Sequence, residues 1–169
     1  MNSEMLLNIA RFIGLILAQV LIFNHINFLG YINPYIYILF IILYPIRREN
    51  RGQFLLLAFL IGFIIDFFSD SGGTHAAAAL CIAYIRPVIL KFAFGNIYEY
   101  QIIKIENTAI GQRIVYLTII ILTHHLILFG LEVFSLSHIL FILKNTLFSS
   151  IFTLFLCILI IALLRKAKT

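Results

Sequence analysis

Charged residues are scarce in this chain of 169 residues, in which lysine, arginine, aspartate and glutamate together make up only 11%. A soluble domain of ordinary composition carries about 25% charged residues and about 45–50% apolar ones. Here the apolar share is 63% and the mean hydropathy is +1.09. The composition therefore excludes an ordinary soluble domain and indicates a chain that lies in a bilayer.

Signatures of the common enzyme classes are also missing. The sequence contains no glycine-rich phosphate loop, no nucleophile elbow and no His-Glu pair at helical spacing. The two cysteines, Cys81 and Cys157, fall inside apolar segments and suit the role of small apolar side chains. Asp66 and Asp70 share one helix face, whereas an intramembrane aspartyl protease needs two aspartates that converge from different helices. We therefore expect no enzymatic activity and no cofactor.

The five histidines raise the question of a metal site, which needs ligands that converge at defined spacing. His124 and His125 are adjacent, so on a helix they point about 100° apart and do not face one site. His25, His75 and His138 fall in connections between apolar segments, where a single histidine is usually solvated. We therefore expect no bound metal ion.

Six apolar segments follow one another along the chain. We place them at about 6–24, 32–46, 54–69, 74–94, 113–133 and 139–164. Their length is close to the roughly 20 residues of a membrane helix, and their continuous hydrophobicity differs from the alternating strands of a membrane barrel. The sequence predicts an all-α polytopic membrane protein with six transmembrane helices in a single domain, residues 1–169.

Lysine and arginine mark alternate connections. They occur in 47–51, 86–113 and 165–168, and are missing from 24–33, 69–74 and 132–138. Because basic loops stay in the cytoplasm, we expect both termini to be cytoplasmic. The net charge of +5 is then explained by topology and anionic lipid, without a nucleic-acid partner. Within the second basic stretch, residues 95–112 fit either an amphipathic helix at the cytoplasmic face or a short ordered loop.

Two lines of residues at every fourth position contain small side chains, in the third and fourth segments, which a very short turn joins. The lines are Ala58, Gly62, Asp66 and Asp70 in the third segment and His75, Ala79, Ala83 and Pro87 in the fourth. Such faces allow helices to pack closely in lipid. With Gly72 and Gly73 in the turn, the pattern predicts a tight antiparallel hairpin.

Asp66 lies within an apolar segment, where we expect an acid either to face the protein interior or to stay protonated. Arg86 lies about 15 Å deeper, so we exclude it as a partner. Lys144 lies at nearly the same depth in the sixth segment, and we predict an Asp66–Lys144 contact, direct or through water. From Asn145 a polar stripe continues at every fourth residue, through Ser149, Thr153 and Cys157, and should face other helices.

Two stretches carry a resemblance to a known family: "ARFIGLILAQVLIF" in the first segment and "GFIIDFFSDSGGTHAAAALCIAYIRPVIL" at residues 62–90. With six short apolar segments and a basic C-terminal tail, they resemble the MreD family of rod shape-determining proteins, in its Bacteroidetes form. The most distinctive part runs from Gly62 and Asp66 to Arg86. The likeness covers nearly the whole chain.

The resemblance implies a non-enzymatic subunit of the bacterial inner membrane that acts in cell elongation and peptidoglycan synthesis. Its implied partners are the single-span protein MreC, the actin-like MreB, the glycosyltransferase RodA and a class B penicillin-binding transpeptidase. It also implies a fold similar to the S-component of energy-coupling-factor transporters. Gly14 and Ala18 resemble the small-residue pair with which those components meet their membrane partner.

A second interpretation belongs to another functional class. A solute-binding or transport protein of the S-component type would keep a polar cavity open to the outside. Asp66, His75, Lys144 and Asn145 are the side chains expected to line it. The two interpretations differ in whether a partner protein or a small molecule is bound.

Overall fold

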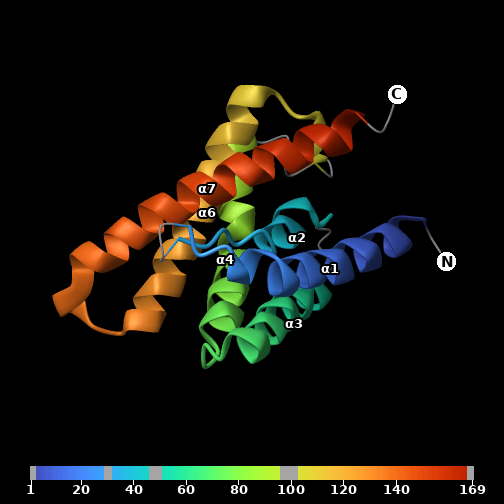
Figure 1. Cartoon of the computed structure of the whole chain (residues 1–169). Helices are drawn as coiled ribbons and strands as arrows, with labels where there is room; N and C mark the ends of the chain where they lie inside the picture. The colour runs from blue at the N-terminus through green and yellow to red at the C-terminus, as the bar shows by residue number, and fades with distance from the viewer. Residues whose placement is uncertain (1–2, 29–31, 46–50, 96–102, 167–169) are drawn as a thin grey trace.

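The computed structural model describes residues 3–28, 32–45, 51–95 and 103–166, and within these ranges every regular element is a helix. Figure 1 shows their arrangement. The long helices are α1 (Ser3–Leu21), α3 (Arg51–Ser69), α4 (Thr74–Phe94), α6 (Ile110–Val133) and α7 (Ile139–Lys166). The short ones are α2 (Ile38–Leu43) and the 3-10 turns η1 (Phe23–His25), η3 (Ile105–Asn107) and η4 (Leu136–His138). The all-α prediction is confirmed.

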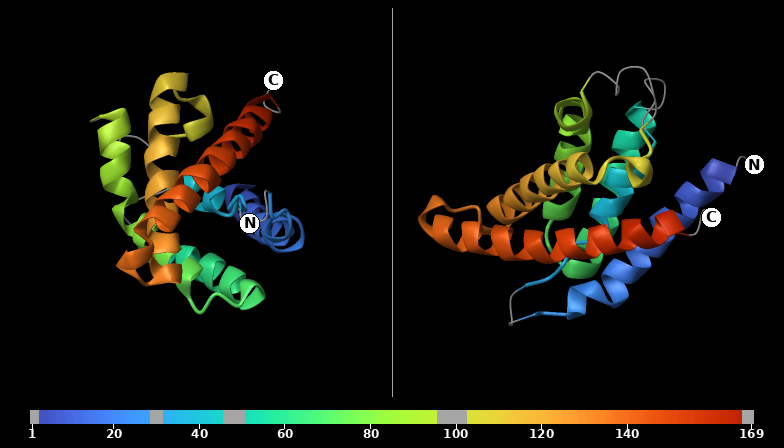
Figure 2. Two further views of the ribbon diagram at one scale, coloured as in Figure 1. Left: turned by 60° about the vertical axis from the view of Figure 1, so that its left-hand side comes forward. Right: turned by 90° about the horizontal axis from the view of Figure 1, so that it is seen from above.

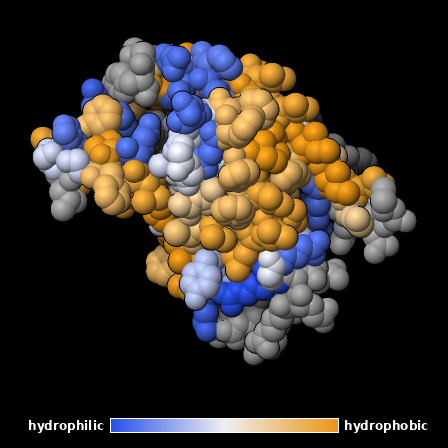
Figure 3. All heavy atoms as spheres, turned by 90° about the horizontal axis from the view of Figure 1, so that it is seen from below, coloured by the Kyte–Doolittle hydropathy of each residue, from blue (hydrophilic) through white to orange (hydrophobic). Residues whose placement is uncertain are grey.

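Five helices of the described part are long and apolar enough to cross a membrane. They are α1 with its continuation to His25, α3, α4, α6 and α7, and they coincide with five of the six predicted segments. Large apolar side chains are exposed along all five. Figure 3 shows a broad hydrophobic surface with hydrophilic groups gathered toward its edges. These properties are compatible with a membrane protein.

The prediction of a second long helix at 32–46 is wrong. It runs extended to Pro34 and beyond, and only six residues form α2. Proline has no N–H and disfavours helix in the residue before it, which explains the late start. All five residues of Ile38–Ile42 are buried. The segment is apolar because it lies inside the protein, and hydropathy alone does not separate such burial from contact with lipid.

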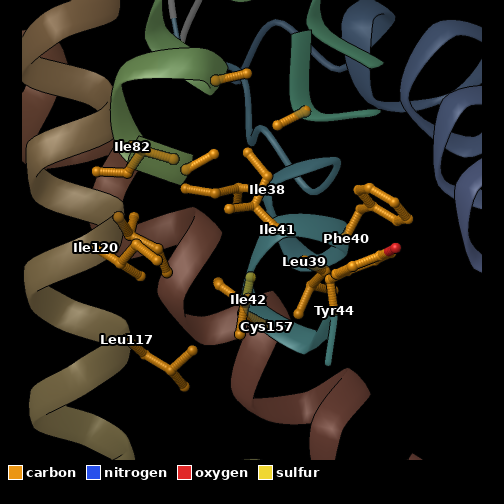
Figure 4. Close-up of a cluster of buried hydrophobic side chains, with 14 of the residues drawn as sticks. Ile38, Leu39, Phe40, Ile41, Ile42, Tyr44, Ile82, Leu117, Ile120 and Cys157 are labelled. Carbon is orange, nitrogen blue, oxygen red and sulfur yellow. The ribbon is translucent and has the colours of Figure 1, made fainter. Parts of the chain in front are cut away.

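Helix α2 lies at the centre of the hydrophobic core. It shares one cluster of buried side chains with Ile82 of α4, Leu117 and Ile120 of α6 and Cys157 of α7 (Figure 4). Helix α4 packs against α2, α3 and α6, while α6 packs along α7. In both views of Figure 2, α1 stands at the margin of the bundle.

The predicted hairpin of α3 and α4 is confirmed, with the two helices packed along each other. At Gly62 a Cβ atom would lie 2.5 Å from the carbonyl oxygen of His75 and 2.6 Å from the Cα of Ala76, so only glycine fits. The turn needs positive φ at Gly72 (65°) and Gly73 (97°), which glycine adopts without strain. Ala58, Ala79 and Ala83 are buried between the helices, as expected from their spacing.

The start of α1 and the end of α7 lie at the same end of the bundle (Figures 1 and 2). This arrangement agrees with an even number of crossings, while the cytoplasmic location of both ends stays a prediction. The stretch 95–112, for which the sequence left an amphipathic helix and a short ordered loop open, falls partly outside the described residues. Its described part contains the single turn η3 before α6 begins at Ile110.

Candidate functional site

Gln19 of α1 holds the extended segment that precedes α2. Its side chain is fully buried, and its Oε1 accepts hydrogen bonds from the N–H groups of Ile36 (2.8 Å) and Tyr37 (3.4 Å). Its Nε2 donates to the carbonyl of Pro34 (3.1 Å). Backbone outside a helix leaves such groups unpaired, and away from water they need a partner. The amide of Gln19 therefore makes a non-helical segment possible inside the bundle.

A second side chain, from the C-terminal helix α7, binds the same segment before α2. The hydroxyl of Thr153, on α7, accepts a hydrogen bond from the N–H of Tyr35 (3.0 Å). The same hydroxyl lies 3.3 Å from Nε2 of His125 on α6. Nδ1 of His125 lies 2.7 Å from the carbonyl of Ile121 and must donate to it, because a carbonyl only accepts. In the neutral ring Nε2 then accepts a hydrogen bond from the hydroxyl of Thr153. The protons are therefore donated in one direction, from the N–H of Tyr35 to Thr153, from Thr153 to His125 and from His125 to the carbonyl of Ile121.

Five aromatic side chains close a ring around this point. Neighbouring centroids lie 5.3–5.6 Å apart in the order Tyr35, His75, Tyr37, His124, His125 and back to Tyr35. We call them the five-ring cluster. They come from the extended segment, the first turn of α4 and the middle of α6. The expectation that His75 would be solvated is wrong, because the short turn after α3 places it inside the helix α4, facing the bundle.

The hydroxyl of Tyr37 joins two of the histidines. It lies 3.0 Å from Nδ1 of His75 and 2.8 Å from Nε2 of His124. A phenol has one proton to donate, so one of the two ring nitrogens must carry its own proton and donate to the phenol oxygen. The pair of bonds thereby restricts the tautomers of both histidines. It connects α4 to α6 through the extended segment.

Asp66 serves as an anchor for the N-terminus of α4. Its two carboxylate oxygens accept hydrogen bonds from the N–H groups of His75 (2.9 Å) and Ala76 (2.8 Å), and the hydroxyl of Ser71 donates to one of them. The first N–H groups of a helix have no partner within it, and the helix dipole favours negative charge there. The acid inside the apolar segment is therefore stabilised by backbone donors.

This geometry adds partners of Asp66 that the sequence did not predict. The partners that the structure describes for its carboxylate come from residues 71–76, while the contact with Lys144, direct or through water, stays a prediction. The prediction that Asp66 faces the interior is confirmed, because only 5% of it is exposed. The sequence prediction considered only cationic side chains as partners of Asp66. It did not consider the backbone N–H groups at the start of a helix, which also bind an anion.

Arg86 takes part in a separate arrangement, as its depth predicted. The guanidinium is buried and donates to the carbonyls of Ile42 (2.7 Å) and Tyr44 (2.8 Å) at the end of α2 and to the hydroxyl of Tyr116 (2.8 Å). It also lies over the ring of Phe54, 5.4 Å from the centroid. A positive charge is favourable where the last carbonyls of a helix are unpaired. Arg86 thus fixes the end of α2.

The polar stripe of α7 faces inward, as predicted. Asn145, Ser149, Thr153 and Cys157 are buried, and so are Thr146 and Ser150. Within the described part of the chain, four of these side-chain oxygens have no hydrogen-bond partner: those of Asn145, Thr146, Ser149 and Ser150. Nδ1 of His124 is in the same condition. A buried polar atom without a partner costs about 1–3 kcal/mol.

The remaining predicted residues lie apart from this region. Gly14 is exposed on α1 and Ala18 is half-buried one turn further along. Among the residues that the structure describes, no three His, Cys, Asp or Glu side chains gather as metal ligands. The described polar contacts of the five-ring cluster hold one part of the chain to another.

Sequence reasoning missed Gln19, Tyr35 and Tyr37. A signal for the two tyrosines was available, because Pro34 disfavours a helix just before Tyr35 and Tyr37, which are two residues apart and so lie on one side of an extended chain. The adjacent histidines were dismissed as metal ligands because they diverge. In the structure they diverge toward Tyr37 and Thr153 respectively.

Comparisons with known proteins identify no relative of this chain. The chain matches no protein-family model, no curated protein and no solved structure.

Proposed function

We propose that the chain is a non-enzymatic membrane subunit that binds the transmembrane helix of a partner protein through α1. The observation that carries the proposal is the position of α1. This helix stands at the margin of the bundle, and Met5, Leu6, Leu7, Ile9, Ile13, Leu17 and Leu21 are exposed along it. It packs on α3, η1 and α2 and leaves the rest of its circumference open.

A comparison of two glycines supports the choice of α1. At Gly62 the space that a side chain would need is filled by the backbone of α4. At Gly14, as at the other described glycines apart from Gly62, no atom lies within 4 Å of the corresponding position. Two helices approach closely in lipid where small residues line the contact. Gly14, with Ala18 beside it, offers a surface of this kind without an occupant from the same chain.

The resemblance to the MreD family supplies the identity of the proposed partner. On this proposal the chain resides in the bacterial inner membrane, binds a single-span protein similar to MreC and helps to maintain cell shape during peptidoglycan synthesis. MreB, RodA and a class B transpeptidase complete the proposed assembly. The polar interior supports a scaffold role, because its described contacts join helices of the same chain.

We also propose that the chain crosses the membrane six times. Residues 32–35 lie outside any helix and span at most about 13 Å at about 3.3 Å each, and the turn at 36–37 with the six residues of α2 adds about 12 Å at about 1.5 Å each. The resulting length of about 25 Å approaches the roughly 30 Å of a bilayer core. Such a second crossing supports the predicted alternation of basic loops and the proposed likeness to S-components.

Co-purification with the single-span partner tests the proposed function. Gly14→Leu should reduce the retained partner about tenfold, which corresponds to the loss of about 1.4 kcal/mol of binding free energy. Gly111→Leu is the matched control, because Gly111 of α6 also has no atom within 4 Å of its Cβ position. Equal retention by both variants would contradict binding through α1.

The alternative function, solute binding or transport of the S-component type, is favoured by the five-ring cluster. Tyr37, His75 and His124 place hydrogen-bonding atoms in the interior. Native mass spectrometry of the purified chain separates the alternatives. A stoichiometric small molecule in a preparation that retains no partner protein would replace the scaffold proposal.

A further inference from the structure

Helix α1 carries a cation within the part of the chain that is apolar enough to cross a membrane. Arg11 lies six residues after Met5, where that part begins, and this spacing places it about 9 Å along the helix axis. A charged side chain at such a depth is costly, and in membrane proteins it is usually paired with another polar group. Arg11 therefore needs a hydrogen-bond acceptor.

The described part of the chain does not supply this acceptor. Arg11 makes no hydrogen bond with the described residues, and its Nε is covered by protein atoms without a partner. Glu4 is the other charged residue of α1, and it precedes Arg11 by seven residues. Side chains on a helix meet at a spacing of three or four residues. The guanidinium thus points to an acceptor on another molecule.

Arg11 shares its side of α1 with Gly14 and Ala18. At about 100° per residue, the three positions lie within about 60° of one another. Phe12, the next residue, points about 100° away and packs on Phe40 of α2, with the ring centroids 5.2 Å apart. Arg11 is partly exposed, at the border between this packed face and the open face. A helix that packs on Gly14 and Ala18 therefore covers Arg11 as well.

The charge of Arg11 selects the chemistry of the acceptor. A helix that packs on Gly14 removes water and lipid from the guanidinium, so the acceptor has to come with that helix. A buried charge without a countercharge is strongly unfavourable, whereas a carboxylate neutralises the guanidinium and binds it through two parallel hydrogen bonds. A lipid phosphate fits less well. An arginine that reaches the headgroups keeps its charged head in water, whereas the Nε of Arg11 is covered by protein.

We propose that Arg11 binds an aspartate or glutamate side chain of the partner's transmembrane helix. This pair depends on the proposed binding through α1 and specifies the chemistry of the partner. Gly14 and Ala18 allow the close approach of the two helices, and apolar residues alone do not distinguish one membrane helix from another. The pair of charges supplies that specificity and fixes how far along α1 the partner lies.

Co-purification with the single-span partner tests the pair. Arg11→Gln should reduce the retained partner about tenfold or more, because the acid of the partner loses its cation in a buried contact. Arg51→Gln is the matched control and should leave retention unchanged, since Arg51 is an exposed cation of α3 that lies over the ring of Tyr84 of α4. If Arg11→Gln retains the partner while Gly14→Leu loses it, the pair is overturned and binding through α1 stands. If both variants retain the partner, binding through α1 is overturned as well.

Exchange of the two charges gives a test that a general loss of structure does not imitate. Replacement of the partner's acid by arginine should restore most of the retention that Arg11→Asp removes. A partner whose transmembrane helix contains no aspartate or glutamate, or an exchange that restores nothing, would overturn the pair. Native mass spectrometry of the Arg11→Gln preparation tests the lipid alternative. The loss of a bound phospholipid with the partner still retained would assign Arg11 to a lipid phosphate and overturn the pair.

Discussion

A single carboxylate, that of Asp66, joins the end of α3 to the start of α4. It accepts two backbone hydrogen bonds from the first turn of α4 and one from Ser71. Bonds to a charged acceptor are stronger than neutral ones, and the acid is 5% exposed. Its position explains how an acid can lie within an otherwise apolar helix.

Asp66→Ala should lower the free energy of unfolding by about 2–4 kcal/mol, because two backbone N–H groups are left buried and unpaired. The measurement is denaturant or thermal unfolding in detergent micelles. Asp70→Asn is the control: Asp70 is exposed at a φ of 51°, where asparagine is also well tolerated. We expect the control to stay within about 0.5 kcal/mol. Similar losses in both variants would show that Asp66 has no special anchoring role.

For the charged residues Asp66 and Arg86, the sequence predicted their location better than it predicted their hydrogen-bond partners. Asp66 was expected to face inward and does, and Arg86 was excluded as its partner on depth and binds elsewhere. The backbone and hydroxyl partners of Asp66 were missed because only charged side chains were considered as partners. The contact with Lys144 stays a prediction. The turn between α3 and α4 brings backbone N–H groups to Asp66. Every residue type except proline carries such a group, so the residue types alone do not predict the contact.

At the scale of elements, the segment before and within α2 determines how the bundle is assembled. It is bound by Gln19 from α1, Thr153 from α7 and Arg86 from α4. Three long helices therefore contribute one polar side chain each to the backbone of one short segment. Irregular backbone is tolerated at such a place because its polar groups are paired inside the protein.

Gln19→Leu should destabilise the chain by about 2–6 kcal/mol, because the N–H groups of Ile36 and Tyr37 lose their acceptor. Gln112→Leu changes an exposed glutamine of α6 in the same way and should have little effect. Thermal unfolding of the two variants side by side gives the difference. If they unfold at the same temperature, the amide of Gln19 does not hold the segment.

The long helices were predictable as elements because their apolar runs exceed the length of a core helix. The hairpin of α3 and α4 was also predictable, from Gly62 and the alanines at fourfold spacing. The segment 32–46 was not, since its hydrophobicity reflects contact with α4, α6 and α7. The five-ring cluster was not predicted because its members come from three separate parts of the sequence, which only the fold brings together.

For the whole molecule, the number of crossings decides which surfaces face which compartment. We expect His25→Cys to react with an impermeant thiol reagent from outside, and Gly52→Cys only after the membrane is opened. Both positions are exposed, on either side of segment 32–45. The experiment uses a chain in which Cys81 and Cys157 are replaced by alanine. Labelling of both from the same side would contradict a second crossing.

The position of α1 is the feature of the whole molecule on which its proposed function depends. The other long helices pack on one another around α2, whereas α1 remains at the margin with Gly14 open. Sequence resemblance predicted a small-residue contact there, and the structure leaves room for it. Apolar residues are exposed on the other long helices too, where they are suited to contact with lipid. Exposure alone therefore does not identify a partner-binding surface.

Site-specific photo-crosslinking in cells tests binding through α1 most directly. A photoreactive amino acid at Ile13 or Leu17, each 52% exposed, should crosslink to a single-span membrane protein. The same probe at Phe155 of α7, which is 61% exposed, should give no such product. Crosslinks from Phe155 with none from Ile13 and Leu17 would contradict partner binding by α1.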